Sequence, residues 1–253
     1  MSRTKTELTQ LITDKEITAK GFLAFESTKE TFEANPATSA VAGGAASGTA
    51  GVANVMAIGQ NMFEYAAKGT QTITAPSIVA NGLNIGMDQT ANDGVEIGHG
   101  ITSRSKHAYT IGVDEVFISV QFSIEDVSGT DDCLVGFRKT QAYQANVDDY
   151  TDMAALNVIA GAINIETILN NAATTTTDTT DTWANEETHT LEVRISKTGA
   201  VTYLIDNEPP TVTAAFTFDA GDVVVPFLFF LNDTDLAGEV ALKNWQVGKL
   251  ENR

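Results

Sequence analysis

Residues 183–210 have the sequence WANEETHTLEVRISKTGAVTYLIDNEPP, which contains two runs of alternating apolar and polar residues. A period of two is typical of β-strands with one buried face. Gly199 ends the loop 197–199 and supplies the left-handed backbone that a three-residue hairpin loop needs. Pro209 and Pro210 end the second strand, because proline has no N–H to donate. The predicted facing residues are Leu191, Val193 and Ile195 on one strand and Val201, Tyr203 and Ile205 on the other.

The same alternation continues through most of the chain after about residue 60. In EVFISVQFSIED (115–126) one face is predicted to be buried and the other largely wet. The run CLVGFRK (133–139) repeats the pattern, and LNVIAGAINIETIL (156–169) is predicted to fold back at Ala160 and Gly161. The predicted buried residues are Val116, Ile118, Val120, Phe122, Ile124, Cys133, Val135 and Phe137, and the predicted wet face holds Phe117, Ser119, Gln121 and Ser123.

The pattern of short strands predicts an all-β fold. Many strands at regular spacing, frequent Gly, Asp and Asn turns and no sustained helical period are typical of an antiparallel β-sandwich. Pro226, within VVVPFLFFL (223–231), predicts an edge position or a bulge for its strand. We therefore expect residues 60–253 to form a single sandwich domain.

The N-terminal part differs in composition from the rest. Residues 1–59 are predicted to form an extended or partly helical arm, in which Thr4 and Glu7 fit a helix capping box. The segment 34–59 is rich in Ala, Gly, Ser and Thr, which favours either a flexible linker or an extended arm ordered against a neighbouring subunit. The apolar residues predicted to make such a contact are Leu8, Leu11, Ile12, Phe22 and Phe25.

Charge and composition disfavour several functions. The 253 residues include 15 Lys and Arg against 33 Asp and Glu, a net charge of −18. Such a chain repels phosphate backbones and anionic lipids, so we expect neither nucleic acid nor membrane as a partner. The single cysteine, Cys133, excludes an internal disulfide and is predicted to be a buried apolar residue. The N-terminus has no apolar signal region, so synthesis in a cytoplasm is expected.

Catalytic motifs are not found in the sequence. Glu125 and Asp126 are adjacent, so they would point to opposite faces of a strand and could not flank a glycosidic bond as a catalytic pair. His99, His107 and His189 do not lie in a triad motif, and AGGAASGTAG (42–51) has no phosphate-loop lysine. We therefore expect no enzymatic activity, no catalytic residues, and no cofactor-binding or metal-binding residues.

Two features leave alternatives open. Asp148, Asp149 and Asp152, or Asp233 and Asp235, are acids in loops of the kind that bind Ca²⁺, although neither segment matches a defined calcium loop. The run ATTTTDTTDTW (173–183) fits a polar strand at a sheet edge, where its aspartates would discourage aggregation, or a glycan-binding loop.

The C-terminal part resembles the concanavalin A-like lectin/glucanase jelly roll, including laminin-G-like modules. The similar elements are Trp183, HTLEVRIS (189–196), VTYLIDNEPP (201–210), DVVVPFLFFLN (222–232) and VALKNWQVGKL (240–250), with Asn207 in place of the usual turn glycine. The segments GLNIGMDQTANDGVEIGHG (82–100) and TDDCLVGFRKTQAYQANVDDYTDMAALNV (130–158) are similar to virion structural proteins of tailed bacteriophages.

This resemblance implies a structural protein of a tailed-phage virion, most simply a decoration or cement protein on the capsid surface. Its partners would be the major capsid protein and further copies of itself, with a trimer suited to three-fold sites of the shell. The alternative is a carbohydrate-binding module of a phage fibre or adhesin, in which Tyr143, Tyr150 and Trp183 would stack on sugar rings. A glycoside hydrolase ranks behind both, because the paired carboxylates are missing.

Overall fold

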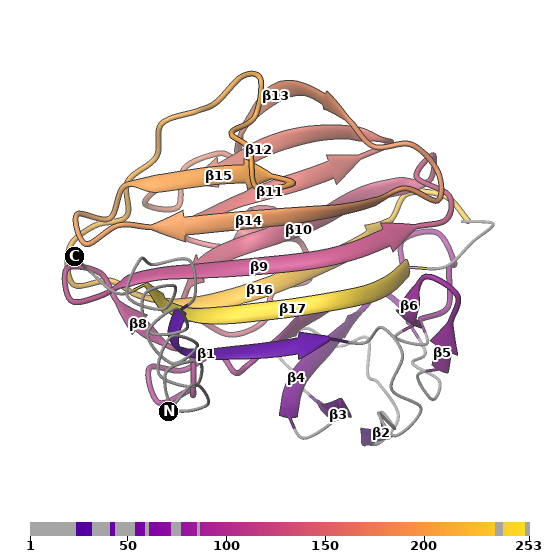
Figure 1. Ribbon diagram of the computed structural model, residues 1–253, viewed down its shortest axis with the longest axis horizontal. Coiled ribbons are helices and arrows are strands. Elements are labelled where there is room, and N and C mark those ends of the chain that lie inside the picture. Colours follow the sequence, from indigo (N-terminus) through magenta and orange to yellow (C-terminus); the bar gives the residue numbers. More distant parts are fainter. Residues whose placement is uncertain are drawn as a thin grey trace, which may run out of the picture.

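The computed structural model describes residues 24–31, 41–43, 54–58, 61–71, 77–84, 87–235 and 240–250. In these ranges the chain forms two antiparallel β-sheets that pack face to face (Figure 1). The one helical element among them is the 3-10 turn Val147–Asp149, and no helix in the described part is long and apolar enough to cross a bilayer. The predicted all-β antiparallel sandwich is confirmed.

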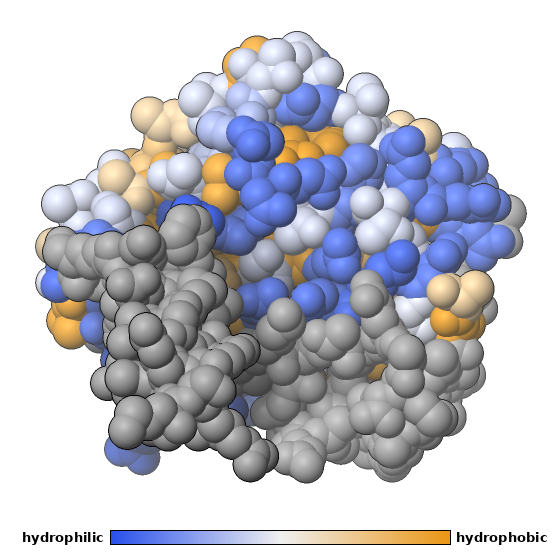
Figure 2. Space-filling model, viewed as in Figure 1, coloured by the Kyte–Doolittle hydropathy of each residue, from blue (hydrophilic) through white to orange (hydrophobic). Residues whose placement is uncertain are grey.

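Sheet A, in front in Figure 1, contains seven of the described strands. Across the sheet they are β15 (Val201–Ile205), β14 (Thr188–Ile195), β9 (Glu115–Ile124), β17 (Val240–Leu250), β6 (Gly82–Asn84) and β5 (Ser77–Val79), with β1 (Ala24–Thr31) also paired to β17. Sheet A presents mainly hydrophilic side chains on the face shown in Figure 2.

Sheet B lies behind and contains ten of the described strands. They are β13 (Thr175–Thr182), β12 (Ala162–Ile168), β11 (Met153–Ile159), β10 (Thr130–Lys139), β16 (Val223–Asn232), β7 (Gly94–Gly98), β4 (Asn61–Lys68), β3 (Asn54–Ile58) and β2 (Val41–Gly43), with β8 (Tyr109–Thr110) also paired to β16. The edge strands β13 and β15 lie on the same side of the sandwich (Figure 1).

The predicted hairpin forms with the predicted register. Leu191 pairs with Ile205, Val193 with Tyr203, and Ile195 with Val201. Gly199 has a φ of 84°, and the N–H of Ser196 donates to the carbonyl of Ala200 at 2.9 Å. The turn at Ala160 and Gly161 is also confirmed, since both have positive φ between β11 and β12.

The main core lies between the sheets. All the residues predicted to face inward from β9 and β10 are buried there, including Cys133, and both tryptophans lie in the same cluster. The outer face of β9 departs from prediction, because Phe117 and Ser123 are 5% and 2% exposed. β9 lies between β14 and β17, and the side chains of these neighbouring strands shield the outer face of a central strand.

Pro226 also departs from prediction, because β16 is a central strand of sheet B. Pro226 pairs with Phe137 of β10 on one side. On the other side β16 pairs with β8 as far as Val224 and with β7 from Phe227 onward. Pro226 therefore lies in the gap between the ladders that β16 forms with β8 and with β7. At this position a backbone N–H is not needed for pairing on that side of the strand.

The outer face of sheet B carries a second apolar cluster, to which the covering segment 140–152 contributes two residues. Its members are Leu134, Val147, Tyr150, Met153, Ala155, Ile168, Phe227 and Phe229. Glu96 lies at its edge, 2.7 Å from Nε of Arg138, 3.1 Å from Nζ of Lys68 and 2.5 Å from the hydroxyl of Tyr150. Burial alone would raise the pKa of Glu96, but Arg138, Lys68 and the hydrogen bond from Tyr150 together outweigh it and lower that pKa. This ionic group fixes the covering segment to the sheet.

The predicted arm lies mostly outside the described residues. This applies to Leu8, Leu11, Ile12 and Phe22, whereas Phe25 falls within β1. Three described strands occur within residues 1–59: β1 pairs with β17, and β2 and β3 pair with one another next to β4. The division at residue 60 and the capsid contact stay predictions.

Candidate functional site

A pocket of about 460 Å³ opens where the edge strand β13 approaches the end of the β14–β15 hairpin. We call it the edge pocket. Residues of β13 and β15 line it, and these two edge strands lie on the same side of the sandwich (Figure 1). Its lining residues are Ile163, Thr180, Asp181, Thr182, His189, Ile205, Asp206, Glu208 and Pro209.

The first wall is a bulge in β13, the threonine-rich strand. The register with β12 shifts between Ala162 and Asn164. At this bulge Thr180 has a φ of 65°, which is rare for a β-branched residue. Side chains compensate: Asp178 accepts from the N–H of Thr180 at 2.8 Å, and the Thr179 hydroxyl donates to the carbonyl of Ile163 at 2.5 Å. The prediction of a polar edge strand is confirmed, and the bulge directs its end into the pocket.

The second wall is the chain that follows β15. Asp206 and Asn207 both have positive φ, and Ile205 and Glu208 exchange backbone hydrogen bonds of 2.8 and 3.0 Å around them. Asn207 thus adopts the conformation that the usual glycine would supply. The chain then crosses to β13, where Thr211 donates from both its N–H and its hydroxyl to Asp181 at 2.9 Å. The segment therefore bridges the edges of the two sheets.

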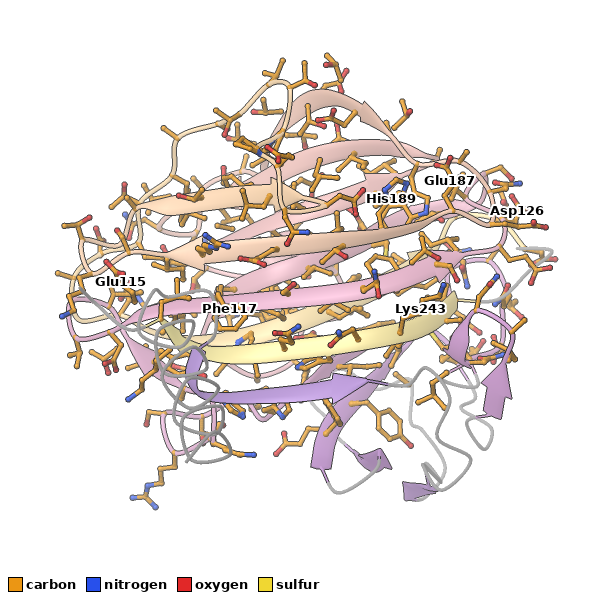
Figure 3. All side chains as sticks on the ribbon, viewed as in Figure 1. Glu115, Phe117, Asp126, Glu187, His189 and Lys243 are labelled. Atoms are coloured by element: carbon orange, nitrogen blue, oxygen red, sulfur yellow. The ribbon has the colours of Figure 1, made fainter. Side chains whose placement is uncertain are left out.

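His189 anchors the pocket from the start of β14. Its Nδ1 lies 2.7 Å from Oδ2 of Asp206. Its Nε2 lies 3.1 Å from Oε2 of Glu187, and both His189 and Glu187 are labelled in Figure 3. The imidazole packs edge-on against Trp183, with ring centroids 4.7 Å apart. The other oxygen of Asp206 accepts from the N–H of Thr190 at 2.8 Å. Two carboxylates and an indole thus fix the ring.

The charges around His189 are coupled. Burial alone would lower the pKa of His189, but the hydrogen bonds to Asp206 and Glu187 outweigh it and raise that pKa above its ordinary value. The pKa of Glu187 is lowered, first by the N–H of Ala184 and then by His189. A protonated His189 offsets part of the negative charge, and Asp181 and Glu208 add two more carboxylates to the lining of the pocket.

The aromatic residues predicted to stack on sugars do not line this pocket. Tyr143, Tyr150 and Trp183 are 2%, 0% and 2% exposed, so the prediction is wrong for all three. The two tyrosines pack over the guanidinium of Arg138 on the outer face of sheet B. Trp183 packs against Phe122 beneath His189. Trp183 belongs to the main core and Tyr150 to the second apolar cluster.

Three of the acids considered for calcium have separate partners. Asp148 accepts from Thr174, and Asp152 lies 3.6 Å from Nζ of Lys139. Asp235 accepts from the N–H of Ala91 at 2.9 Å. In the described part of the chain no group of three or more His, Cys, Asp or Glu side chains is arranged to hold a metal ion.

The other residues considered for catalysis are dispersed. Glu125 directly follows β9 and lines a smaller pocket of about 260 Å³ with Glu186. His99 and His107 pack with ring centroids 4.6 Å apart, and burial lowers the pKa of His107 to about 4. Burial raises the pKa of the Cys133 thiol well above its usual range. The structure brings none of these groups to the edge pocket.

Sequence reasoning missed the association of His189 with Asp206. A signal was available, because the hairpin register places the residues before Leu191 beside those after Ile205. Glu208 belongs to the same turn and could have been included. The contribution of Asp181 had no comparable signal, because it depends on a bulge and on a crossing segment 30 residues away.

No family model and no curated protein matches this chain. Among solved structures it is similar to protein SO2946 of unknown function from Shewanella oneidensis MR-1, at 13% identity, 88% and 86% coverage of the two chains and a TM-score of 0.50. It is also similar to the carbohydrate recognition domain of Emp47p, at 11% identity, 74% and 89% coverage of the two chains and a TM-score of 0.48. A third similar structure is the carbohydrate-binding module CBM66 from Bacillus subtilis, at 12% identity, 74% and 95% coverage and a TM-score of 0.43. At these identities the likeness concerns the fold alone.

Proposed function

We propose that this protein is a carbohydrate-binding module whose ligand occupies the edge pocket. The observation that carries the proposal is the composition of the lining. Apolar surface from Ile205 and Pro209 lies beside the carboxylates of Asp206 and Glu208. A sugar likewise presents apolar C–H faces beside polar hydroxyl groups. Specific small-molecule pockets combine apolar surface with a few placed polar groups.

The hydroxyls of a sugar find complementary partners in the pocket. Carboxylates are strong hydrogen-bond acceptors, and the hydroxyls of Thr180 and Thr182 both donate and accept. Asp206 is held by His189 and by the N–H of Thr190, and Asp181 by Thr211, so neither group has to be ordered by the ligand. Preorganisation of this kind lowers the entropic cost of binding.

The proposal is one of binding without catalysis. General acid catalysis needs a carboxylic acid that can give its proton to a leaving group. Asp181 and Asp206 instead accept hydrogen bonds from backbone N–H groups, which is the role of a fixed acceptor.

A structural role in a tailed-phage particle is our second proposal. It is supported by the resemblance of residues 82–100 and 130–158, and by a net charge of −18, which suits a protein at high local concentration. The two proposals are compatible in a fibre or adhesin. Co-sedimentation with empty capsids tests the role in the particle. A decoration protein should co-sediment with the capsids, and a variant that lacks residues 1–34 should not.

The carbohydrate proposal is tested with a glycan array and calorimetric titration of a retained glycan. Thr182→Phe fills the pocket from an exposed position, and Thr175→Phe places the same side chain at the other exposed end of β13. We expect Thr182→Phe to weaken binding at least about tenfold and Thr175→Phe to leave it unchanged. Equal binding by the two variants, or an array with no retained glycan, would contradict the proposal.

A further inference from the structure

The ionisable groups of the edge pocket are predominantly acidic. Asp181, Asp206 and Glu208 line it, and His189 is the one basic side chain among the described lining residues. His189 is itself bound on its far side by Glu187, 3.1 Å away. Even with the imidazole protonated, the four carboxylates exceed the cations in this group.

These carboxylates come from two parts of the chain and line the same pocket. Asp181 belongs to the bulge of β13, whereas Asp206 and Glu208 belong to the turn that follows β15. Like charges repel one another when they are brought together, and a bound cation relieves that repulsion. The net charge of −18 adds a long-range field of the same sign.

We infer that the edge pocket selects glycans that carry unacetylated amino groups over neutral or acidic glycans. The inference rests on the proposed carbohydrate binding and specifies the ligand class of that same site. A protonated sugar amine would form charge-assisted hydrogen bonds with the carboxylates, whereas an N-acetyl group brings no charge. A uronic acid would be repelled.

Glu208 is the carboxylate best placed to contact the amine. Asp206 is occupied by His189 and Thr190, and Asp181 by Thr211. Glu208 is exposed and lines the pocket. Glu208→Gln therefore removes a charge without removing these contacts. Asp219→Asn is the matched control, because Asp219 is exposed outside the pocket, in the loop before β16.

The experiment is calorimetric titration at pH 5.5, where sugar amines are protonated. The ligands are a β-1,4-linked glucosamine tetramer, its fully N-acetylated counterpart, a galacturonic acid tetramer, and spermine as a cation without hydroxyls. We expect the glucosamine tetramer to bind at least about fivefold tighter than the acetylated one, and the uronic tetramer not to bind. Glu208→Gln should reduce the preference at least about twofold, and Asp219→Asn should leave it unchanged.

The outcomes separate the two claims. Equal affinity for the glucosamine and acetylated tetramers, or an unchanged preference in Glu208→Gln, overturns the inference while carbohydrate binding stands. Binding of the galacturonic acid tetramer also overturns the inference while carbohydrate binding stands. Binding of spermine without binding of any sugar overturns carbohydrate binding itself, and so does the absence of binding to any of these ligands and to the array.

Discussion

The carboxamide of Asn157 donates a hydrogen bond of 2.6 Å to the carboxylate of Asp132, across the neighbouring strands β11 and β10. Its oxygen accepts from the N–H of Cys133 at 2.8 Å, so the amide is held at both ends. Burial raises the pKa of Asp132 to about 7, which the bond from Asn157 opposes and Glu166 reinforces. The outer face of sheet B thus holds a carboxylate that is costly to ionise.

We expect Asp132→Asn to stabilise the protein at pH 8 and to have little effect at pH 4. The pKa of Asp132 in the folded protein lies above the unfolded value of about 3.9. The contribution of Asp132 to the free energy of unfolding is therefore fully present below about pH 4 and is lost as the pH rises through about 7. The gain at pH 8 should be on the order of 3 kcal/mol, measured by urea unfolding. Asp149→Asn removes a charge from the exposed turn and is the control. The same gain at both pH values would contradict the assignment.

Glu96→Gln should cost about 3–5 kcal/mol of unfolding free energy, because it leaves Arg138 and Lys68 buried without their counter-ion. Glu64→Gln makes the same chemical change on β4, where the carboxylate is partly exposed, and should cost less than about 1 kcal/mol. Adding Lys68→Met to Glu96→Gln should cost less than the sum of the two single changes. Equal costs for the two glutamates would argue against the buried ionic group.

Gly199→Ala should be more destabilising than Gly112→Ala by at least about 1 kcal/mol. Both glycines have positive φ, which costs an alanine about 1–2 kcal/mol. A Cβ at Gly199 would lie 2.2 Å from the carbonyl oxygen of Phe218, whereas none of the described atoms lies within 4 Å of one at Gly112. Thermal and urea unfolding of both variants measure the difference, and equal costs would show that the hairpin loop yields without strain.

His189→Gln should lower the melting temperature more at pH 5.5 than at pH 9. A folded pKa above the unfolded value of about 6.5 means that the stabilisation is fully present below pH 6.5 and is lost as the pH rises through the folded pKa. Asp206 and Glu187 are about half exposed, so solvent screening limits the effect to roughly 1 kcal/mol, or about 2–4 °C for a chain of this size. A pH-independent loss would mean that His189 acts through its contact with Trp183 alone.

Local patterns predicted the strands well. The alternation in 188–205 predicted the register of β14 and β15, because a two-residue period and a short loop leave few other pairings. The prediction failed where neighbours that are distant in sequence decide the environment. Arg138 lies on the polar face of an alternating strand, yet it is 1% exposed, because Glu96 and Tyr150 cover it from other parts of the chain.

The edge pocket shows the same limit. His189 and Asp206 could be paired from the hairpin register, because they belong to its two ends. Thr180 and Asp181 could not be, because a bulge in β13 and a crossing segment bring them to the site. The prediction that aromatic residues would stack on sugars failed for a related reason. A tryptophan or tyrosine in a stretch that reads as a loop is equally suited to a core.

The most direct test of carbohydrate binding at the edge pocket is a nuclear magnetic resonance titration of ¹⁵N-labelled protein with the glycan that an array retains most tightly. The account predicts that the largest amide shifts occur at residues 180–182, 189 and 205–208, that they follow one saturation curve, and that Thr182→Phe abolishes them. Shifts centred on Glu125 and Glu186, or on the outer face of sheet B, would contradict it.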